Sequence, residues 1–177
     1  MLRLSRGLLA IAVLAGASLL AMWTEAQAQS VKIVALGASN TAGTGVGKGS
    51  AWPARLQAML KSRGINAGVI NAGIHGDTTG GMLARLDRAA PPGTRLVILQ
   101  PGGNDARRGQ AGQTAGNIAE ITSRLAARKV ALVIMGQSYL RAVPSGERQS
   151  DRIHFTPEGH SRLASAILPQ VLAALGR

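Results

Sequence analysis

Four short apolar segments recur along the chain, and a turn rich in glycine or small polar residues follows each of the first three. The segments run from Val31 to Leu36, Gly68 to Asn71, Leu96 to Gln100 and Val130 to Met135. Nearly continuous apolar character is typical of strands that are covered on both faces of a parallel sheet. Longer stretches with helical periodicity separate the segments, so the sequence predicts an α/β fold made of repeated strand–helix–strand units.

Three helices are expected around this sheet. Their apolar stripes are Trp52, Leu56, Met59 and Leu60; then Ile118, Ile121 and Leu125; and finally Leu163, Ile167, Leu168, Val171 and Leu175. Thr156 can cap the last helix, and Pro157 suits its first position, where a missing N–H costs nothing. His160 is expected on the surface of that helix. With no internal repeat and no linker, residues 29–177 are predicted to form one domain.

The first 28 residues have the features of a secretory signal peptide. Arg3 and Arg6 precede an apolar stretch from Leu8 to Met22, and small residues then surround a cleavage site at Ala28. The apolar stretch is shorter than the roughly 20 residues that a spanning helix needs. We therefore expect residues 1–28 to be removed and the protein to be exported, either periplasmic or secreted.

The composition narrows the classes of partner. The chain has twenty basic and eight acidic residues. The resulting formal charge of +12 favours contact with anionic membranes or other polyanions. The basic residues are scattered, and a single Tyr and a single Phe offer almost nothing on which bases could stack, so nucleic-acid binding is not expected. Without cysteine, disulfides and thiolate sites are excluded. No spacing of histidine and carboxylate residues predicts a metal site, and no cofactor is expected.

Ser39, Asp151 and His154 are the candidate catalytic residues. Ligand sites in open parallel sheets lie beyond the carboxyl ends of the strands, and Ser39 follows the first predicted strand directly. Asp151 and His154 share a short loop before the last helix. A serine becomes a nucleophile when a base takes its proton and a third group orients that base, so the three residues together predict a Ser-His-Asp triad.

The turns after the first three strands can also supply an oxyanion hole. The candidate donors are the backbone N–H groups of Ser39 and Gly76 and the side-chain amide of Asn104. They would converge if the three strands lie side by side. His75, next to Gly76, could contact substrate, although an exposed loop position is the simpler alternative. Asp77 is expected to cap a helix and Asp105 to stabilise a turn.

The segments GASN, NAGIHGD, GGND and DRIH, in this order, resemble the four sequence blocks of the SGNH (GDSL-like) hydrolases. The bacterial lysophospholipase and acyl-thioesterase subgroup is the most similar. The resemblance implies a flavodoxin-like three-layer α/β/α sandwich. It places the nucleophile on Ser39, oxyanion donors on Gly76 and Asn104, and the acid and base on Asp151 and His154.

The chain departs from that family in two places. Ala38 stands where the first block normally has Asp, which should alter hydrogen bonding in the turn and leave the nucleophile in place. Only Gly136 to Ser150 separate the fourth strand from the Asp-x-x-His loop, where relatives have another helix and strand. This length predicts a sheet of about four strands, a less supported acid/base loop and a more open acyl pocket.

The expected function is serine-dependent hydrolysis of small acyl esters, thioesters or lysophospholipids. One alternative is a deacetylase or acyltransferase that uses the same residues on envelope polysaccharide. Another is a binding protein that keeps the fold and has lost activity through Ala38 and the shortened segment.

Overall fold

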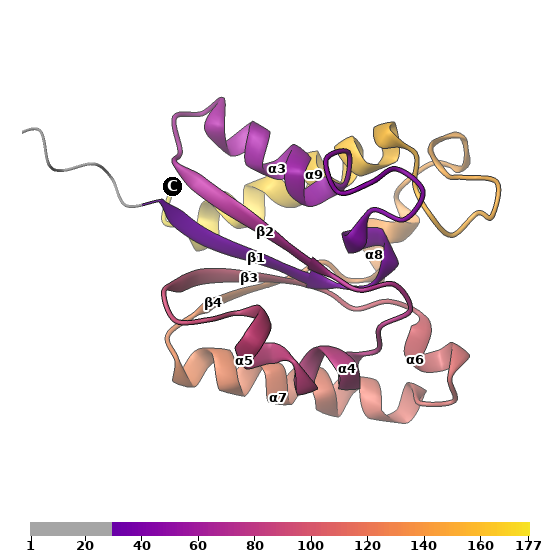
Figure 1. Ribbon diagram of the computed structural model, residues 1–177, viewed down its shortest axis with the longest axis horizontal. Helices are drawn as coiled ribbons and strands as arrows, with labels where there is room; N and C mark the ends of the chain where they lie inside the picture. The colour runs from indigo at the N-terminus through magenta and orange to yellow at the C-terminus, as the bar shows by residue number, and fades with distance from the viewer. Residues whose placement is uncertain (1–29) are drawn as a thin grey trace, which may run out of the picture.

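The computed structural model describes residues 30–177, so the predicted signal peptide over residues 1–28 lies outside the described residues. Four strands form one parallel sheet in the order β2-β1-β3-β4. They are β1 (Val31–Gly37), β2 (Ala67–Gly73), β3 (Thr94–Gln100) and β4 (Ala131–Ile134). All four predicted strands are confirmed. Helices cover both faces of the sheet, which gives the three-layer α/β/α arrangement (Figure 1).

Helices α3 (Trp52–Lys61) and α9 (Pro157–Ala174) cover one face of the sheet. Alternate side chains of a strand point to opposite faces, and on this side β1 and β3 contribute Ile33, Ala35, Leu96 and Ile98. The predicted stripe of α3 packs against them, with Trp52, Leu56 and Leu60 fully buried. Burying each such leucine contributes about 1.5–3 kcal/mol, so this layer is a major source of stability.

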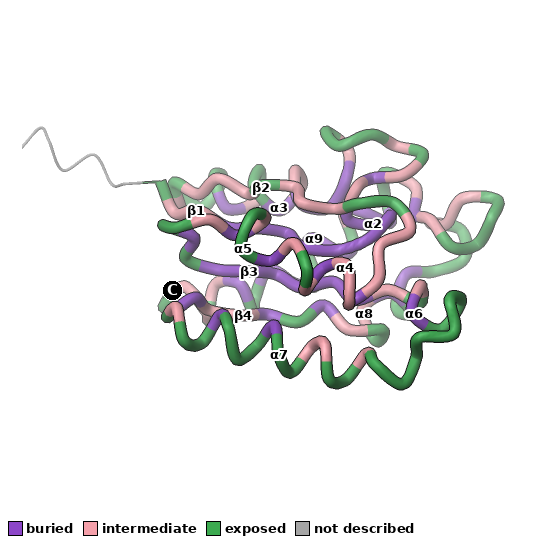
Figure 2. The backbone as a smooth tube through the Cα atoms, turned by 60° about the horizontal axis from the view of Figure 1, so that its bottom comes forward, coloured by how far each residue is buried: buried purple, intermediate pink, exposed green. Residues whose placement is uncertain are grey.

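Helices α4 (Thr79–Ala84), α5 (Leu86–Ala89) and α7 (Thr114–Ala127) cover the other face. Here the intervening strand residues meet the helices in a second core, made of Val34, Leu36, Val97, Leu99, Met82, Leu86, Ile121 and Leu125. Figure 2 shows burial along β3, which is continuous from Leu96 to Gln100, whereas α7 alternates between exposed and buried positions. The central strands β1 and β3 are therefore fixed from both sides, while β2, at the sheet edge, is only partly buried.

Helix α9 begins as predicted, because the Thr156 hydroxyl accepts a hydrogen bond from Gly159 N at 3.4 Å and Pro157 occupies the first turn. The expectation that His160 lies on the surface is wrong: its side chain is fully buried. His160 is three residues before Leu163 and seven before Ile167, so helical periodicity places it on the apolar face. Its Nδ1 accepts a hydrogen bond from Trp52 N at 3.3 Å, which ties α9 to the start of α3.

The connection from β4 to α9 contains a short helix, α8 (Gln137–Arg141), and a 3₁₀ turn, η2 (Ser145–Glu147), and no further strand. This confirms the prediction of a four-stranded sheet, with β4 at its edge. Three short elements complete the described residues: α2 (Ser39–Ala42), α6 (Asn104–Arg107) and the 3₁₀ turn η1 (Ala111–Gln113). Among residues 30–177, no helix has the length and apolar character needed to cross a membrane.

Candidate active site

Ser39 lies where the central strand β1 turns into α2, at the carboxyl edge of the sheet. The turn is tight: a Cβ at Gly37 would lie 2.2 Å from Thr41 Oγ1, so only glycine fits there. Gly43, with a φ of 84°, ends α2 and donates its N–H to Ser39 O at 3.0 Å. The serine is 9% exposed and is thus held in a nearly buried, narrowly defined position.

Asp151 and His154 are hydrogen bonded to each other in the loop before α9. His154 Nδ1 lies 2.5 Å from Asp151 Oδ2, while Asp151 Oδ1 accepts from the backbone N–H groups of His154 at 3.0 Å and Ile153 at 2.9 Å. These bonds, led by the His154 backbone N–H, lower the pKa of Asp151 to about 2. The carboxylate can therefore only accept, so Nδ1 of a neutral imidazole carries the proton and Nε2 is left as a base.

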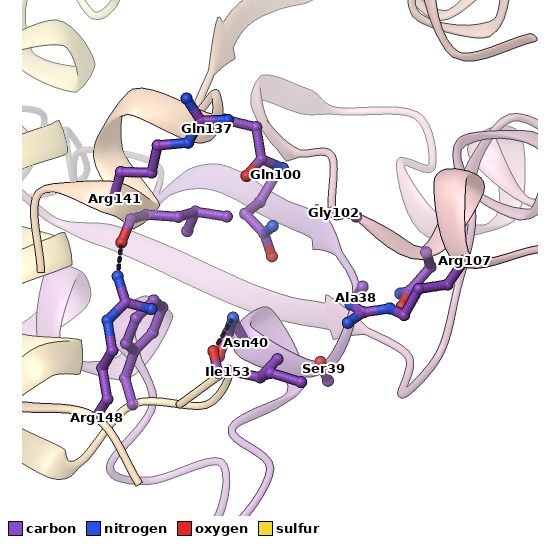
Figure 3. Close-up of a pocket in the computed structure, with 14 residues that line it drawn as sticks. Ala38, Ser39, Asn40, Gln100, Gly102, Arg107, Gln137, Arg141, Arg148 and Ile153 are labelled. Carbon is purple, nitrogen blue, oxygen red and sulfur yellow. Dashed lines mark hydrogen bonds between the residues drawn. The ribbon is translucent and has the colours of Figure 1, made fainter. Parts of the chain in front are cut away.

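Two side chains connect this loop to the segment that carries Ser39. Asn40 Nδ2 donates to Ile153 O at 3.2 Å, a bond that Figure 3 shows beside Ser39. Gln149 Nε2 donates to Thr44 O at 2.8 Å, just beyond α2. The residue after Ser39 is thus tied to the residue before His154, which brings the serine and the histidine to the same corner of the sheet.

Arg148 fastens the acid/base loop where the connection is short. Its backbone forms an antiparallel bridge with Phe155, and its guanidinium lies 4.9 Å from the centre of the Phe155 ring. The same guanidinium donates to Leu140 O at 2.5 Å and to Val143 O at 3.2 Å. One side chain therefore satisfies carbonyl groups of the segment after β4 and holds them against the start of α9.

Gly76 lies on the loop after β2, and Asn104 begins α6 just after β3; these two strands flank β1. Gly76 has a φ of 74°, which favours glycine, and Asn104 Nδ2 donates to Asp77 O at 2.8 Å. Within residues 30–177, the N–H groups of Ser39 and Gly76 donate to no acceptor. One of the two N–H groups of the Asn104 side-chain amide likewise has no acceptor among these residues. The three predicted oxyanion donors are thus available just after three adjacent strands.

His75 contacts the candidate base directly. Its ring stacks on that of His154 with the ring centres 5.8 Å apart and the planes 29° apart, and its Nδ1 lies 3.1 Å from Thr44 Oγ1. The predicted contact of His75 with substrate stays a prediction. The contact with His154 was not predicted from the sequence, because no local sequence pattern indicates that two histidines so distant in the chain are neighbours.

Residues 35–152 match the sequence model of the GDSL-like Lipase/Acylhydrolase family. The chain belongs to this family. It is 34% identical over 126 residues to the esterase TesA of Pseudomonas aeruginosa, a match that covers 70% of this chain and 62% of that protein. It is also 34% identical over 128 residues to an arylesterase of Vibrio mimicus, covering 71% and 62% respectively. The chain therefore spans less than two thirds of the length of these curated relatives.

A crystal structure of TesA has the same fold as this GDSL-like chain, with a TM-score of 0.74 and 27% sequence identity. The superposition covers 81% of this chain and 99% of the solved one. The predicted resemblance to the SGNH hydrolases, which was based on the four sequence blocks, is confirmed. The fold that this resemblance implied is confirmed with it.

In this GDSL-like fold the prediction that Asp77 caps a helix is wrong, because Thr78 is the cap of α4 and accepts from Gly81 N at 3.2 Å. Asp77 instead forms an ion pair with Arg85 at 2.7 Å. Arg85 also donates to Gly37 O at 3.2 Å, directly before the Ser39 turn. Asp77 thus positions an arginine that supports the turn.

Asp105 was expected to stabilise a turn, but the structure shows it buried in the packing of the fold. It is 2% exposed and accepts hydrogen bonds from both the backbone N–H and the hydroxyl of Thr79. Asn117 donates to the same hydroxyl at 3.0 Å. A carboxylate suits this position because the first residue of α4 presents two donors to a site from which water is excluded.

A pocket of about 250 Å³ opens beside Ser39 of this GDSL-like chain, between the ends of β1 and β3 and helix α8 (Figure 3). Gln100 lies at its base and accepts from Thr41 Oγ1 at 3.0 Å, which links β3 to α2. Within residues 30–177, no three histidine and carboxylate side chains gather in a way that could hold a metal ion.

Proposed function

We propose that this chain is a serine ester hydrolase in which Ser39 is the nucleophile, His154 the general base and Asp151 the residue that orients the base. Membership of the GDSL-like family supports the reaction class. The observation that carries the assignment is the 2.5 Å pair of His154 and Asp151, in a loop tied by Asn40 to the segment that begins with Ser39.

In the proposed reaction, His154 Nε2 takes the hydroxyl proton of Ser39 while Oγ attacks the ester carbonyl. The tetrahedral intermediate collapses to an acyl-serine, and His154 returns the proton to the departing alcohol. Water then attacks the acyl-serine by the same route and releases the acid. Asp151 stays a carboxylate throughout, because its pKa of about 2 keeps it ionised in neutral solution.

The negative oxygen of the intermediate would be stabilised by the N–H groups of Ser39 and Gly76 and by the amide of Asn104. These donors are fixed before the substrate arrives: Ser39 by the Gly37 turn, Gly76 by its backbone conformation and Asn104 by its bond to Asp77 O. Loss of one such donor typically costs on the order of a hundredfold or more in rate.

We propose small acyl esters, including lysophospholipids and thioesters, as substrates, with Ser39 acylated in each case. The names of the relatives, an esterase and an arylesterase, support the ester class. Export through the predicted signal peptide would put the protein in the periplasm or outside the cell. Its charge of +12 would there favour approach to anionic membranes.

The test is hydrolysis of p-nitrophenyl esters from acetyl to palmitoyl by residues 29–177, beside the Ser39→Ala variant. We expect the variant to lose at least about a thousandfold in kcat, because the remaining donors and the pocket cannot replace the nucleophile. Ser123→Ala, an exposed serine on α7, is the matched control and should keep full activity. Equal, negligible turnover by the parent chain and Ser39→Ala would instead support the binding-protein alternative.

A further inference from the structure

The pocket beside Ser39 carries positive charge and no negative charge. Three guanidinium groups line it, from Arg107, Arg141 and Arg148, and none of its lining residues is an Asp or Glu. Figure 3 shows Arg107 extending from α6 toward Ala38 and Arg148 standing on the opposite side of the pocket. The polar side chains of Gln100 and Gln137 lie between these two sides.

The position of the pocket relative to the site identifies the part of the substrate that it takes. The departing alcohol must lie near His154, because that residue protonates it. The pocket lining includes Ser39 and Asn104, and also Ile153 and Phe155 on either side of His154, but not His154, His75 or Gly76 themselves. The pocket therefore lies on the side of the reacting carbonyl away from the base, which is the side of the acyl group.

Two of the three arginines are free to bind a ligand. Arg148 is occupied by the carbonyl groups of Leu140 and Val143 and acts as a fixed charge. Arg107 and Arg141 are exposed, and neither forms a hydrogen bond from its side chain or an ion pair with another described residue. A guanidinium presents a rigid set of N–H donors that suits a carboxylate, so each of these two side chains is equipped to recognise an anion.

The same pocket is poorly suited to a long hydrocarbon chain. Its largest apolar side chain, Phe155, is fully buried and lies beneath the guanidinium of Arg148. The exposed side chain of Gln137 adds an amide to the lining, whereas the carboxamide of Gln100 is 1% exposed and is hydrogen bonded to Thr41 and Pro101. An alkyl chain placed here would remove water from guanidinium and amide groups without replacing their hydrogen bonds, which costs free energy.

We infer that the preferred acyl group ends in a carboxylate, so that the substrate class is the half-ester of a short dicarboxylic acid. This inference rests on the proposed ester hydrolysis at Ser39 and narrows its proposed substrates to short acyl esters, which leaves out long-chain lysophospholipids. Water cleaves the bond between the acyl carbon and the alcohol oxygen, the alcohol takes a proton, and the dicarboxylic acid is released. The far carboxylate takes no part in the bond changes and is held by a free guanidinium of the pocket lining, that of Arg107 beside Ala38 or that of Arg141 on the other side.

The experiment compares phenyl half-esters of glutaric and adipic acid with phenyl valerate and phenyl hexanoate, followed by the absorbance of released phenol. Each pair has the same acyl chain length and differs by a methyl group in place of the carboxylate. We expect kcat/KM to be about tenfold higher for each half-ester than for its neutral partner, because one charge-assisted hydrogen bond contributes about this much. Ser39→Ala measures the spontaneous hydrolysis of each ester.

The double variant Arg107→Gln, Arg141→Gln should lower the ratio of half-ester to neutral-ester kcat/KM by about tenfold. Its counterpart with lysine at both positions keeps the charge and should retain most of the preference. Arg95→Gln is the matched control for general attraction by a basic protein, because Arg95 is exposed and lies at the opposite end of β3 from the site. It should leave the ratio unchanged.

A parent chain that hydrolyses the neutral esters as well as the half-esters would overturn the inference and leave the proposed function intact. So would a double variant whose ratio falls no further than that of Arg95→Gln. If no ester of either kind is hydrolysed in a Ser39-dependent manner, the proposed function fails, and the inference fails with it.

Discussion

Protonation of His160 should destabilise the fold in mildly acidic solution. The side chain is fully buried, its Nδ1 accepts from Trp52 N at 3.3 Å, and its Nε2 has no partner among the described residues. Burial, with a smaller contribution from the nearby Arg55, lowers the pKa of His160 from 6.5 to about 4. A charged imidazole would lose the Trp52 bond and remain in an apolar layer.

The sign and size of the effect follow from this difference in pKa. Between pH 6.5 and 4 the unfolded chain binds a proton at His160 and the folded chain does not, so acid favours unfolding. The contribution is complete above pH 6.5 and declines as the pH falls toward 4. A fall in pKa from 6.5 to about 4 corresponds to about 3 kcal/mol in the free energy of unfolding. Small domains have only about 5–15 kcal/mol in total.

The assay is urea unfolding of residues 29–177 at several pH values between 7.5 and 4. Trp52, the only tryptophan of this segment, is a fluorescence probe at the site itself. The variant His160→Gln keeps an acceptor for Trp52 N but does not titrate, so its free energy of unfolding should fall less with acid by about 3 kcal/mol. Titrating carboxylates affect both proteins alike and cancel in the comparison. An equal acid dependence in the two proteins would refute the reasoning.

Three further substitutions, one of them with a control, test how the site is built. Gly73→Ala should destabilise the chain by about 1–3 kcal/mol and reduce hydrolysis, because a Cβ there would lie 2.2 Å from Ala42 N on the Ser39 helix. Gly68→Ala on the same strand, where the nearest atom would be 3.8 Å away, should stay within about 0.5 kcal/mol in thermal unfolding; equal effects would contradict this view. Asp105→Ala should cost about 2–3 kcal/mol in urea unfolding because it leaves two buried donors of α4 unpaired, and a loss below about 0.5 kcal/mol would count against it. Asp151→Asn should lower kcat by about 10³–10⁴-fold through the wrong imidazole tautomer, and kcat within tenfold of the parent would argue against the proposed role.

The sheet and its helical layers could be predicted from the sequence because local patterns determine them. Strands buried on both faces appear as continuous apolar runs, and the stripe that ends at Leu60 appears at helical spacing. The order of the strands then placed the turns that carry Ser39, Gly76 and Asn104 at one edge. The short segment from Gly136 to Ser150 set the number of strands, since it leaves too few residues for another helix and strand.

The polar contacts inside the fold could not be predicted in this way. Asp105 contacts Thr79 and His75 contacts His154 across large separations in sequence, and such partners depend on how whole elements pack. His160 is different, because its spacing from Leu163 and Ile167 already placed it on the buried face. There, the usual preference of histidine for the surface was outweighed by helical periodicity.

The edge position of β4 has a consequence for how this architecture tolerates loss. Parallel sheets of this type extend outward from their centre, and Ser39 is carried by β1, which has neighbours on both sides. A further helix and strand beyond β4 would pair with β4 alone, so their absence removes no hydrogen bond from β1 or β3. The acid/base loop is held by Arg148, Gln149 and Asn40, none of which belongs to such a unit. The contacts that bring Ser39, Asp151 and His154 to one corner of the sheet therefore do not depend on a strand beyond β4.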